Sequence, residues 1–300
     1  MSPGVLAEVA TTRIRFVASD GFPLGGWLHE PDGRVDHAVV LATGAGIRAE
    51  RYRHFSNFLA RHGVATLAFD YRGVGLSRPA RLRGLVAGFE DWAELDAGAA
   101  LEWTAARYPR ATLTGIGHSI GALLIGAPAA AQRLAQLVLI APHAGHCDDY
   151  APPIRLLVRA SFRVAGPPLR SALGYFPARL FRIGEDLPSR VAVQWGAYHG
   201  DARPLAAGGS DPARASRLLD QVAALRMPAL VLSAPDDGWA TEAGVRRLLQ
   251  AYSSLLVVRR IVAPADLRQR RIGHWGLFRR SAASLAWPII LRFIEPALAR

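Results

Sequence analysis

The sequence predicts an α/β protein with a mainly parallel β-sheet and helices on both faces. Three observations predict this architecture: strand-like and helix-like segments alternate, the helix-like segments are apolar on one face, and 51% of the 300 residues are hydrophobic. Alternating strands and helices require crossover connections between parallel strands. A chain of this length and hydrophobicity forms one large domain or two small ones with a buried core.

The predicted strands are short apolar runs bounded by glycine, proline or polar residues. In chain order they are residues 37–43, 64–70, 111–116, 135–142, 227–235 and 254–262. The segment before them, residues 11–33, looks like an antiparallel hairpin.

The predicted helices are segments whose apolar residues recur three and four positions apart. They are residues 51–63, 89–109, 119–130, 241–252 and 282–298. In the first of them Tyr52, Phe55 and Leu59 share one face, and Gly63 ends the helix. In the last, Pro288 predicts a kink.

Residues 143–226 break the alternation, because they are rich in proline and glycine and their strand signals are weak. We predict that they form a cap or lid insertion, and that residues 1–142 and 227–300 form the core. Such an insertion lies over the carboxyl edge of the sheet, where open α/β sheets place their sites.

One segment of this insertion, residues 154–164, combines basic and apolar residues with helical spacing. The basic residues are Arg155, Arg159 and Arg163, and the apolar residues opposite them are Leu156, Leu157 and Phe162. The pattern predicts a lid helix over the site. A helix on a membrane surface and an ordinary solvated helix are the alternatives.

The basic residues, 36 in number, are all arginines, and the formal net charge is +12. Without lysine, the chain has no Schiff-base lysine, no P-loop lysine and no tyrosine–lysine dehydrogenase pair. The arginines are spread along the chain, and it has no zinc-finger spacing, RNP motif or basic tail. We therefore expect no nucleic-acid partner.

The number of cysteines and the length of the apolar runs indicate in which cellular compartment the protein is expected. A single cysteine, Cys147, excludes an internal disulfide and suits a reducing compartment. No apolar run reaches the ~18 uncharged residues of a membrane span, and the first ten residues lack the pattern of a secretion signal. We expect a cytoplasmic protein without a membrane partner; the sequence does not indicate its oligomeric state.

The most informative motif is Gly117-His118-Ser119-Ile120-Gly121, which has the form G-x-S-x-G. It stands between a predicted strand and a predicted helix, so the chain must turn sharply there. Both positions need glycine, because a side chain at either one would collide with neighbouring elements. The turn exposes the serine Oγ at the start of a helix, which makes Ser119 the candidate nucleophile.

A serine hydroxyl needs a base, and the base needs an orienting carboxylate. After such a turn the chain order is serine, acid, histidine. His274 is the candidate base, because it is the histidine that lies beyond the last predicted strand. Asp237 is the preferred acid, because it stands nine residues after Pro228, which opens the preceding strand; Asp236 is the alternative.

With these motifs the chain resembles the α/β-hydrolase superfamily over nearly its whole length. Residues 70–79, DYRGVGLSRP, look like the loop after the fourth strand of that fold. Residues 174–188, 236–240 and 271–280 resemble more closely bacterial hydrolases of the serine-aminopeptidase and monoglyceride-lipase type. The resemblance implies a serine hydrolase with a cap and no cofactor, and it does not imply a substrate.

Many members of that superfamily carry a His-Gly pair after the third strand, where residues 43–46 of this chain read TGAG. An oxyanion hole needs backbone N–H groups rather than a histidine side chain, so the function can be retained. We expect Ile120 to supply one donor and Ala45 the other, with Gly46 or Ile47 as alternatives to Ala45.

The predicted reaction is cleavage of an ester, thioester or small amide through an acyl-enzyme on Ser119, and acyl transfer is a close variant. The expected partner is a small acyl substrate, with no cofactor and no metal. The alternatives are an inactive binding protein of the same fold and an NAD-dependent oxidoreductase. The latter would use Gly44, Gly46, Ala49 and Asp70, but it leaves the serine, aspartate and histidine motifs unexplained.

Residues 141–150 bring several potential metal ligands together. These are His143, His146, Cys147, Asp148 and Asp149. A metal cluster is one interpretation. A polar loop that lines the cleft is the preferred one.

Overall fold

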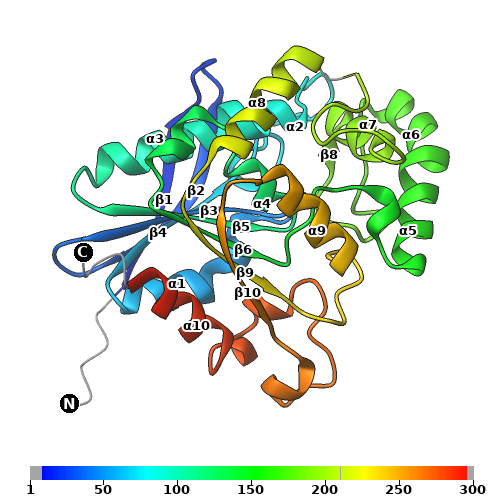
Figure 1. Ribbon diagram of the computed structural model, residues 1–300. Helices are drawn as coiled ribbons and strands as arrows, with labels where there is room; N and C mark the ends of the chain where they lie inside the picture. The colour runs from blue at the N-terminus through cyan, green and yellow to red at the C-terminus, as the bar shows by residue number, and fades with distance from the viewer. Residues whose placement is uncertain (1–8, 210, 296–300) are drawn as a thin grey trace.

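A computed structural model describes residues 9–209 and 211–295 of the chain. The strands of its main sheet are β1 (Val9–Val17), β2 (Pro23–Pro31), β3 (His37–Ala42), β4 (Val64–Asp70), β5 (Thr112–His118), β6 (Gln136–Ile140), β9 (Pro228–Ser233) and β10 (Leu256–Ile261). They lie side by side in the order β1-β2-β4-β3-β5-β6-β9-β10 (Figure 1). β2 runs antiparallel to β1 and β4, and the pairs from β4 to β10 are parallel. The predicted mainly parallel sheet and the N-terminal hairpin are therefore confirmed.

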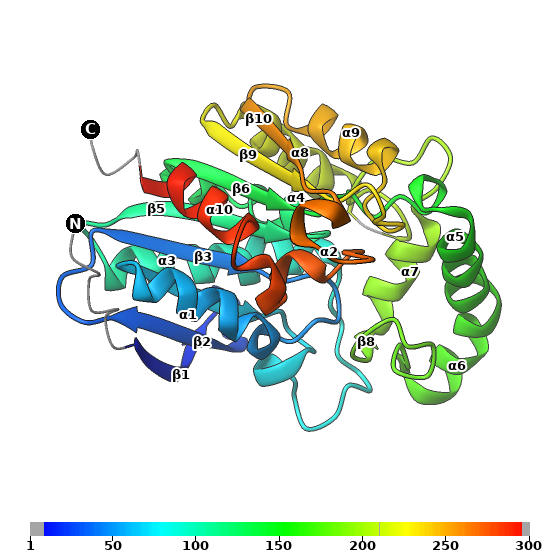
Figure 2. The same ribbon diagram turned by 90° about the horizontal axis from the view of Figure 1, so that it is seen from below.

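Helices cover both faces of the sheet, because the side chains of each strand alternate between the faces. The α-helices of the core are α1 (Arg53–Arg61), α2 (Phe89–Asp91), α3 (Gly98–Arg107), α4 (Gly121–Leu124), α8 (Pro212–Ala224), α9 (Glu242–Ala251) and α10 (Ala286–Ile294). On one face α1 and α10 pack against Val39 and Leu41 of β3, and on the other α3, α8 and α9 share a core with Val40 (Figures 1 and 2). None of the helices within the described ranges is long and apolar enough to cross a membrane.

The predicted helix over residues 119–130 is wrong beyond its first turn. α4 ends at Leu124, and a separate 3-10 helix follows at Ala129–Arg133. The side chain of Tyr252, just after α9, donates its hydroxyl hydrogen to the Ala122 carbonyl oxygen at 2.6 Å. Gly126 lies against the same ring, where a Cβ would overlap the tyrosine oxygen. The helix that the local sequence favours is therefore ended by contacts with Tyr252, which lies 130 positions after Ala122 in the chain.

The final helix begins later than predicted and is not kinked at its proline. α10 starts at Ala286, so Pro288 lies in its first turn. Proline fits there because the N–H groups of the first turn have no partner within a helix. The kink predicted at Pro288 is therefore wrong. Positions 296–298 of the predicted helix lie outside the described residues.

The segment between β6 and β9 adds α5 (Pro152–Arg159), α6 (Gly166–Leu173) and α7 (Ser189–Ala197), with a small sheet of β7 (Tyr175–Phe176) and β8 (Leu187–Pro188). These elements lie together at one end of the main sheet (Figures 1 and 2). α8, by contrast, packs against α2 and α9. We propose that α5 to α7 and the small sheet form the cap, and that α8 belongs with the core.

The apolar face predicted for residues 154–164 is buried only in part. α5 continues into a π-helical turn, Ala160–Ala165. Leu156 and Leu157 are 70% and 39% exposed, whereas Val158 and Phe162 are buried. Phe162 stacks on Phe176 of β7 with ring centroids 4.3 Å apart, and Val158 shares its face because it lies four positions earlier. The buried side chains of residues 154–164 therefore pack against another part of the chain between β6 and β9, at Phe176.

β3 and β5 are neighbours, and the connections that follow them lead to opposite sides of the sheet. This reversal creates a crevice at the carboxyl ends of the two strands. Ala42 and Gly117 pair in register near the ends of these strands. The loop after β3 and the turn after β5 therefore start side by side.

Candidate active site

The turn after β5 holds Ser119 in a conformation that is rare for a residue with a side chain. Its φ is +60°, in the left-handed region that mainly glycine occupies. A Cβ on Gly121 would lie 2.5 Å from the Ala42 carbonyl oxygen, and one on Gly117 would overlap the backbone of Ala122. The prediction that a side chain at position 117 or 121 would collide with neighbouring elements is therefore confirmed.

Three predicted site residues come together at the carboxyl end of the sheet, although they are far apart in the sequence. Ser119 Oγ lies 2.9 Å from His274 Nε2, and His274 Nδ1 lies 2.8 Å from an Asp237 carboxylate oxygen. Ser119 follows β5, Asp237 follows β9, and His274 lies in the loop between β10 and α10. The Asp237 side chain is fully buried, and the His274 side chain is 17% exposed.

The second carboxylate oxygen of Asp237 is held by its own loop. It accepts hydrogen bonds from the backbone N–H groups of Trp239, at 2.9 Å, and Ala240, at 3.1 Å. Burial alone would raise the pKa of Asp237, but its interaction with His274 and these hydrogen bonds lower the pKa below the ordinary value. The carboxylate is therefore anionic and fixed in orientation.

Asp236, the alternative acid, contacts different groups. Its carboxylate accepts hydrogen bonds from the backbone N–H groups of Ile272, at 2.9 Å, and Gly273, at 3.1 Å. These residues immediately precede His274 in the chain. Asp236 thus anchors the loop that carries the histidine, whereas Asp237 contacts the imidazole ring.

The loop after β3 brings backbone N–H groups to the nucleophile. A Cβ on Gly44 would lie 3.3 Å from Ser119 Cβ, which shows how closely the loop approaches. The Ile47 N–H donates to the Gly44 carbonyl oxygen at 3.0 Å. The Ala45, Gly46 and Ile120 N–H groups make no hydrogen bond within the part of the chain that the structure describes.

Asp70, at the end of β4, ties the end of this loop to the loop that follows β4. Its carboxylate accepts hydrogen bonds from the N–H groups of Ala49, at 2.7 Å, and Leu76, at 2.8 Å. Burial raises the pKa of Asp70 to about 6. The carboxylate that a dinucleotide site would offer to a ribose is therefore used within the protein.

Tyr52 and His118 connect three loops of the site by a directed chain of hydrogen bonds. The Gly44 N–H donates to the Tyr52 hydroxyl oxygen at 3.0 Å, so the hydroxyl hydrogen is free to donate to His118 Nδ1 at 2.8 Å. His118 Nε2 lies 3.0 Å from the His274 carbonyl oxygen. Because a carbonyl only accepts, Nε2 carries the proton. The loop after β3, the serine turn and the histidine loop are thereby joined.

The loop at residues 141–150 contributes one side chain to the serine. His143 Nε2 lies 2.8 Å from Ser119 Oγ. The Cys147 thiol donates to the Trp195 carbonyl oxygen, and burial raises the pKa of this thiol to about 12. Ion pairs occupy the two aspartates, Asp148 with Arg159 and Asp149 with Arg247. Over residues 9–209 and 211–295, no cluster of three or more His, Cys, Asp and Glu side chains is arranged to hold a metal.

A small apolar cavity adjoins the Ile120 residue of the serine turn. Its walls include Phe89, Ala144, Gly145, Trp195, Tyr198 and Leu205. The cavity volume is only about 10 Å³, which is space for about one water molecule. Trp195 and Tyr198 come from α7 and its C-terminal end, so the cap segment forms one side of the cavity.

The sequence predicts no site role for Tyr52 or His118, and it predicts Tyr52 on the apolar face of a helix. It predicts His143 in a polar loop that lines the cleft, without a contact to the serine. One signal was available for His143: it follows the predicted strand 135–142, so it must emerge at the carboxyl edge of the sheet near Ser119.

A strained serine turn after a central parallel strand, with loops from β3, β9 and β10 around it, defines the α/β-hydrolase class. The sequence model of the family described as serine aminopeptidase, S33, matches residues 33–263 of this chain. The match covers more than half of the chain, and the chain belongs to this hydrolase family.

Solved structures share the fold at low sequence identity. An esterase from Pyrococcus furiosus is 16% identical, with a TM-score of 0.61 over 96% of this chain and 91% of that chain. An alpha/beta hydrolase from Penicillium sp. sh18 is 17% identical, with a TM-score of 0.61 over 97% of this chain and 100% of that chain. A thermostable carboxyl esterase from Bacillus coagulans is 15% identical, with a TM-score of 0.60 over 96% of this chain and 99% of that chain.

Proposed function

We propose that the protein is a serine hydrolase that cleaves an ester, thioester or small amide through an acyl-enzyme. Ser119 is the nucleophile, His274 the general base and acid, and Asp237 the orienting carboxylate. The observation that carries the proposal is the continuous path from Asp237 through His274 to Ser119, with contacts of 2.8 and 2.9 Å. The esterases that share the fold favour an ester as the substrate.

In the first half of the reaction, Ser119 Oγ attacks the acyl carbon and its proton passes to His274 Nε2. The carbonyl oxygen becomes an oxyanion, which the N–H groups of Ile120 and Ala45 stabilise. His274 then gives the proton to the departing alcohol, thiol or amine. Asp237 accepts the Nδ1–H throughout and stabilises the imidazolium that forms.

In the second half, His274 takes a proton from water as the water oxygen attacks the acyl carbon. The bond from that carbon to Ser119 Oγ breaks, and His274 returns the proton to Oγ. The acid is released and the free serine is restored. Ala45 is favoured over Ile47 as the second oxyanion donor because the Ile47 N–H already donates to Gly44.

The cavity beside Ile120 is the proposed position of the acyl chain. Its walls are mainly apolar and it is small, so we expect short, uncharged acyl groups to react best. A series of p-nitrophenyl esters from acetate to decanoate tests this with wild-type protein and Ser119→Ala. The proposal predicts fastest release from the short esters and none above background from Ser119→Ala. Equal rates for the two proteins would contradict it.

A further inference from the structure

A second histidine reaches the proposed nucleophile from the loop after β6. His143 Nε2 lies 2.8 Å from Ser119 Oγ, and the residue is only 2% exposed. Ala141 turns the chain toward the serine with φ of +46°, a conformation that costs energy for a residue with a side chain. The His143 ring packs edge-on against Tyr150 with ring centroids 5.5 Å apart. The loop thus holds one particular orientation of this ring.

The hydrogen bonds of His143 determine which of its nitrogens carries the proton. The Gly145 N–H donates to His143 Nδ1 at 2.9 Å, and a backbone N–H can only donate. Nδ1 is therefore unprotonated, and a neutral ring carries its proton on Nε2, which faces Ser119 Oγ. His143 consequently cannot take the serine proton as His274 does. It can only donate a hydrogen bond to the serine oxygen.

His143 is neutral at the pH values at which such a site works. Burial lowers the pKa of His143 to about 3, and the electrostatic effect of His274 lowers it further by more than Asp237 raises it. A charged His143 would compete with His274 for the negative charge of the site. A neutral ring leaves the pairing of His274 with Asp237 intact.

The two histidines leave one direction open at the serine oxygen. A hydroxyl oxygen has four tetrahedral positions: the bond to Cβ, the hydrogen, and two lone pairs. In Ser119 the hydrogen points to His274 Nε2 at 2.9 Å, and one lone pair accepts the Nε2–H of His143 at 2.8 Å. The remaining lone pair is the one that attacks an acyl carbon. His143 therefore selects the reactive orientation of the hydroxyl.

We propose that His143 is a further catalytic residue, a neutral donor that stabilises the negative charge developing on Ser119 Oγ. This inference rests on the proposed function. During attack the Oγ–carbon bond forms while the Oγ–H bond breaks, and the proton goes to His274 Nε2. During deacylation the Oγ–carbon bond breaks and His274 returns the proton. His143 keeps its own proton in both steps, and its hydrogen bond strengthens as charge grows on Oγ.

Two substitutions distinguish the effect of losing the hydrogen-bond donor from the effect of losing the volume of the His143 ring. His143→Leu fills much of the space and has no donor, whereas His143→Gln keeps an N–H donor. We measure kcat and KM with a p-nitrophenyl ester, and the rate of labelling by a fluorophosphonate. His143→Leu is expected to lower kcat and the labelling rate by about tenfold or more with little change in KM. His143→Gln is expected to recover part of the loss.

His146→Gln is the matched control, because His146 lies in the same loop and is also buried. Its Nε2 lies 3.0 Å from the Gly200 carbonyl oxygen and has no contact with the serine. This variant should react at nearly the wild-type rate. If wild type reacts and His143→Leu reacts equally fast, the role of His143 is disproved and the proposed function stands. If wild type itself does not react, the proposed function fails instead.

A measurement on wild type covers the case in which His143→Leu does not fold. Nitrogen NMR of the protein labelled with ¹⁵N-histidine reports the protonated nitrogen of each ring. We expect a neutral ring protonated at Nε2 between pH 5 and 8, whose signals move in Ser119→Ala because the acceptor is lost. A His143 ring protonated at Nδ1, or signals indifferent to Ser119→Ala, would overturn the proposal.

Discussion

Asp236 and Asp237 are neighbours in the chain, but their carboxylates contact different parts of the site. Asp237 contacts the His274 ring, and Asp236 accepts two backbone N–H groups from the residues before that histidine. The carboxylate of a triad fixes the imidazole tautomer and stabilises the imidazolium. A carboxylate that anchors a loop acts only on the position of the histidine. The two residues should therefore differ greatly in their effect on the rate.

Asparagine substitutions measure this difference. Asp237→Asn is expected to lower kcat by about 10⁴-fold, because an amide N–H would favour the wrong imidazole tautomer. Asp236→Asn keeps one of the two oxygens that accept the backbone N–H groups and loses one hydrogen bond, so it is expected to lower kcat by about tenfold or less. The measurement is ester turnover with thermal melting as the folding control. Equal losses in the two variants, or a larger loss in Asp236→Asn, would reverse the assignment.

Spacing and chain order were sufficient to propose Ser119, Asp237 and His274, because each stands at a fixed place after a strand. Their catalytic roles stay predictions. Tyr52 and His143 were not assigned because their partners are far away in the sequence: Tyr52 lies 66 positions from His118, and His143 lies 24 positions from Ser119. Which nitrogen of His143 is protonated depends on a backbone N–H two residues away. No spacing rule reports such a contact.

Among the elements of the fold, Tyr52 links the three loops that form the site: the loop after β3, the serine turn and the histidine loop. Its hydroxyl accepts from the Gly44 N–H and donates to His118, whose other nitrogen donates to the His274 carbonyl oxygen. All of these groups except the His274 carbonyl oxygen are buried. Without the hydroxyl, the Gly44 N–H and His118 Nδ1 would both lose their partner, and unpaired buried polar groups are costly.

Tyr52→Phe tests this coupling. We expect the free energy of unfolding to fall by about 1–3 kcal/mol and kcat to fall by about three- to tenfold, since the loops of the oxyanion donor and the histidine are no longer tied. Urea unfolding and ester turnover measure the two effects. Tyr71→Phe is the matched control, because within the described residues the buried Tyr71 hydroxyl has no hydrogen-bond partner. A Tyr52→Phe protein as stable and active as Tyr71→Phe would refute the coupling.

The elements themselves were predicted with uneven success, and the failures have physical causes. The strands were found because a strand buried on both faces is a continuous apolar run, as in "VATLAFD" at residues 64–70. α4 was predicted too long because Tyr252, distant in the sequence, occupies the Ala122 carbonyl oxygen. The burial of Phe162 was predicted correctly, and Phe176 and Trp195 contact its ring from other parts of the cap segment. The prediction was wrong for Leu156 and Leu157, which are exposed.

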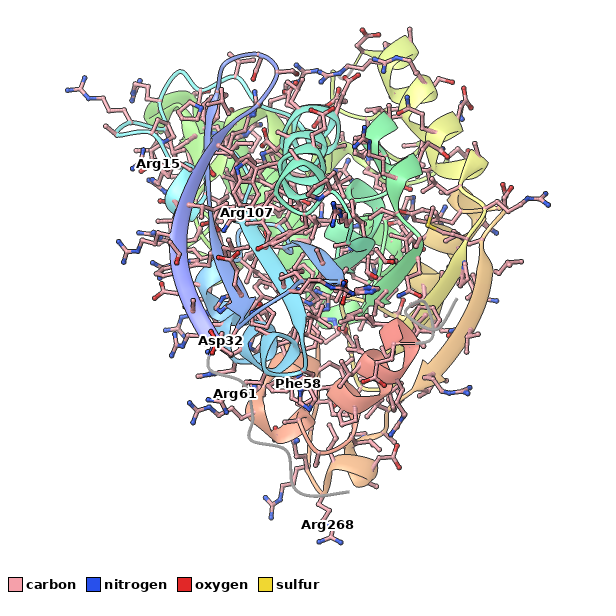
Figure 3. The ribbon with its side chains drawn as sticks, turned by 90° about the vertical axis from the view of Figure 1, so that its left-hand side faces the viewer. Arg15, Asp32, Phe58, Arg61, Arg107 and Arg268 are labelled. Carbon is pink, nitrogen blue, oxygen red and sulfur yellow. The ribbon has the colours of Figure 1, made fainter. Side chains whose placement is uncertain are left out.

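At the scale of the molecule, exposed arginines surround a core that contains several buried histidines. Exposed arginines project from different elements, as Figure 3 shows for Arg15 on β1, Arg61 on α1, Arg107 on α3 and Arg268 after β10. Burial lowers the pKa values of four buried histidines, His29, His37, His118 and His143. As the pH falls, these histidines therefore take up protons in the unfolded chain before they do so in the folded protein.

His37 gives the clearest test of this pH dependence, because it lies at the amino end of β3, away from the site. Its folded pKa is lowered to about 4 by burial, below the ordinary value near 6.5 of an unfolded chain. The unfolded state binds the proton first, so this contribution to stability is complete above about pH 6.5 and is lost as pH falls toward 4. From pH 7.5 to 5 the loss is about 2 kcal/mol.

Urea unfolding of wild type, His37→Gln and His62→Gln at both pH values measures this contribution. The stability advantage of wild type over His37→Gln should shrink by about 2 kcal/mol from pH 7.5 to 5. His62 is exposed, and His62→Gln is the control for replacing a histidine at the surface. An advantage over His37→Gln that is the same at both pH values would show that His37 does not titrate as described.

The central claim, that Ser119 is an activated nucleophile, is tested most directly by the site of covalent modification. Purified wild-type protein is treated with a fluorophosphonate, and the adduct is located by mass spectrometry of its peptides. We expect one adduct, on Ser119, that is absent from Ser119→Ala and forms much more slowly in Asp237→Asn. No adduct on the wild-type protein, or the same labelling of Ser119→Ala, would show that Ser119 is not an activated nucleophile.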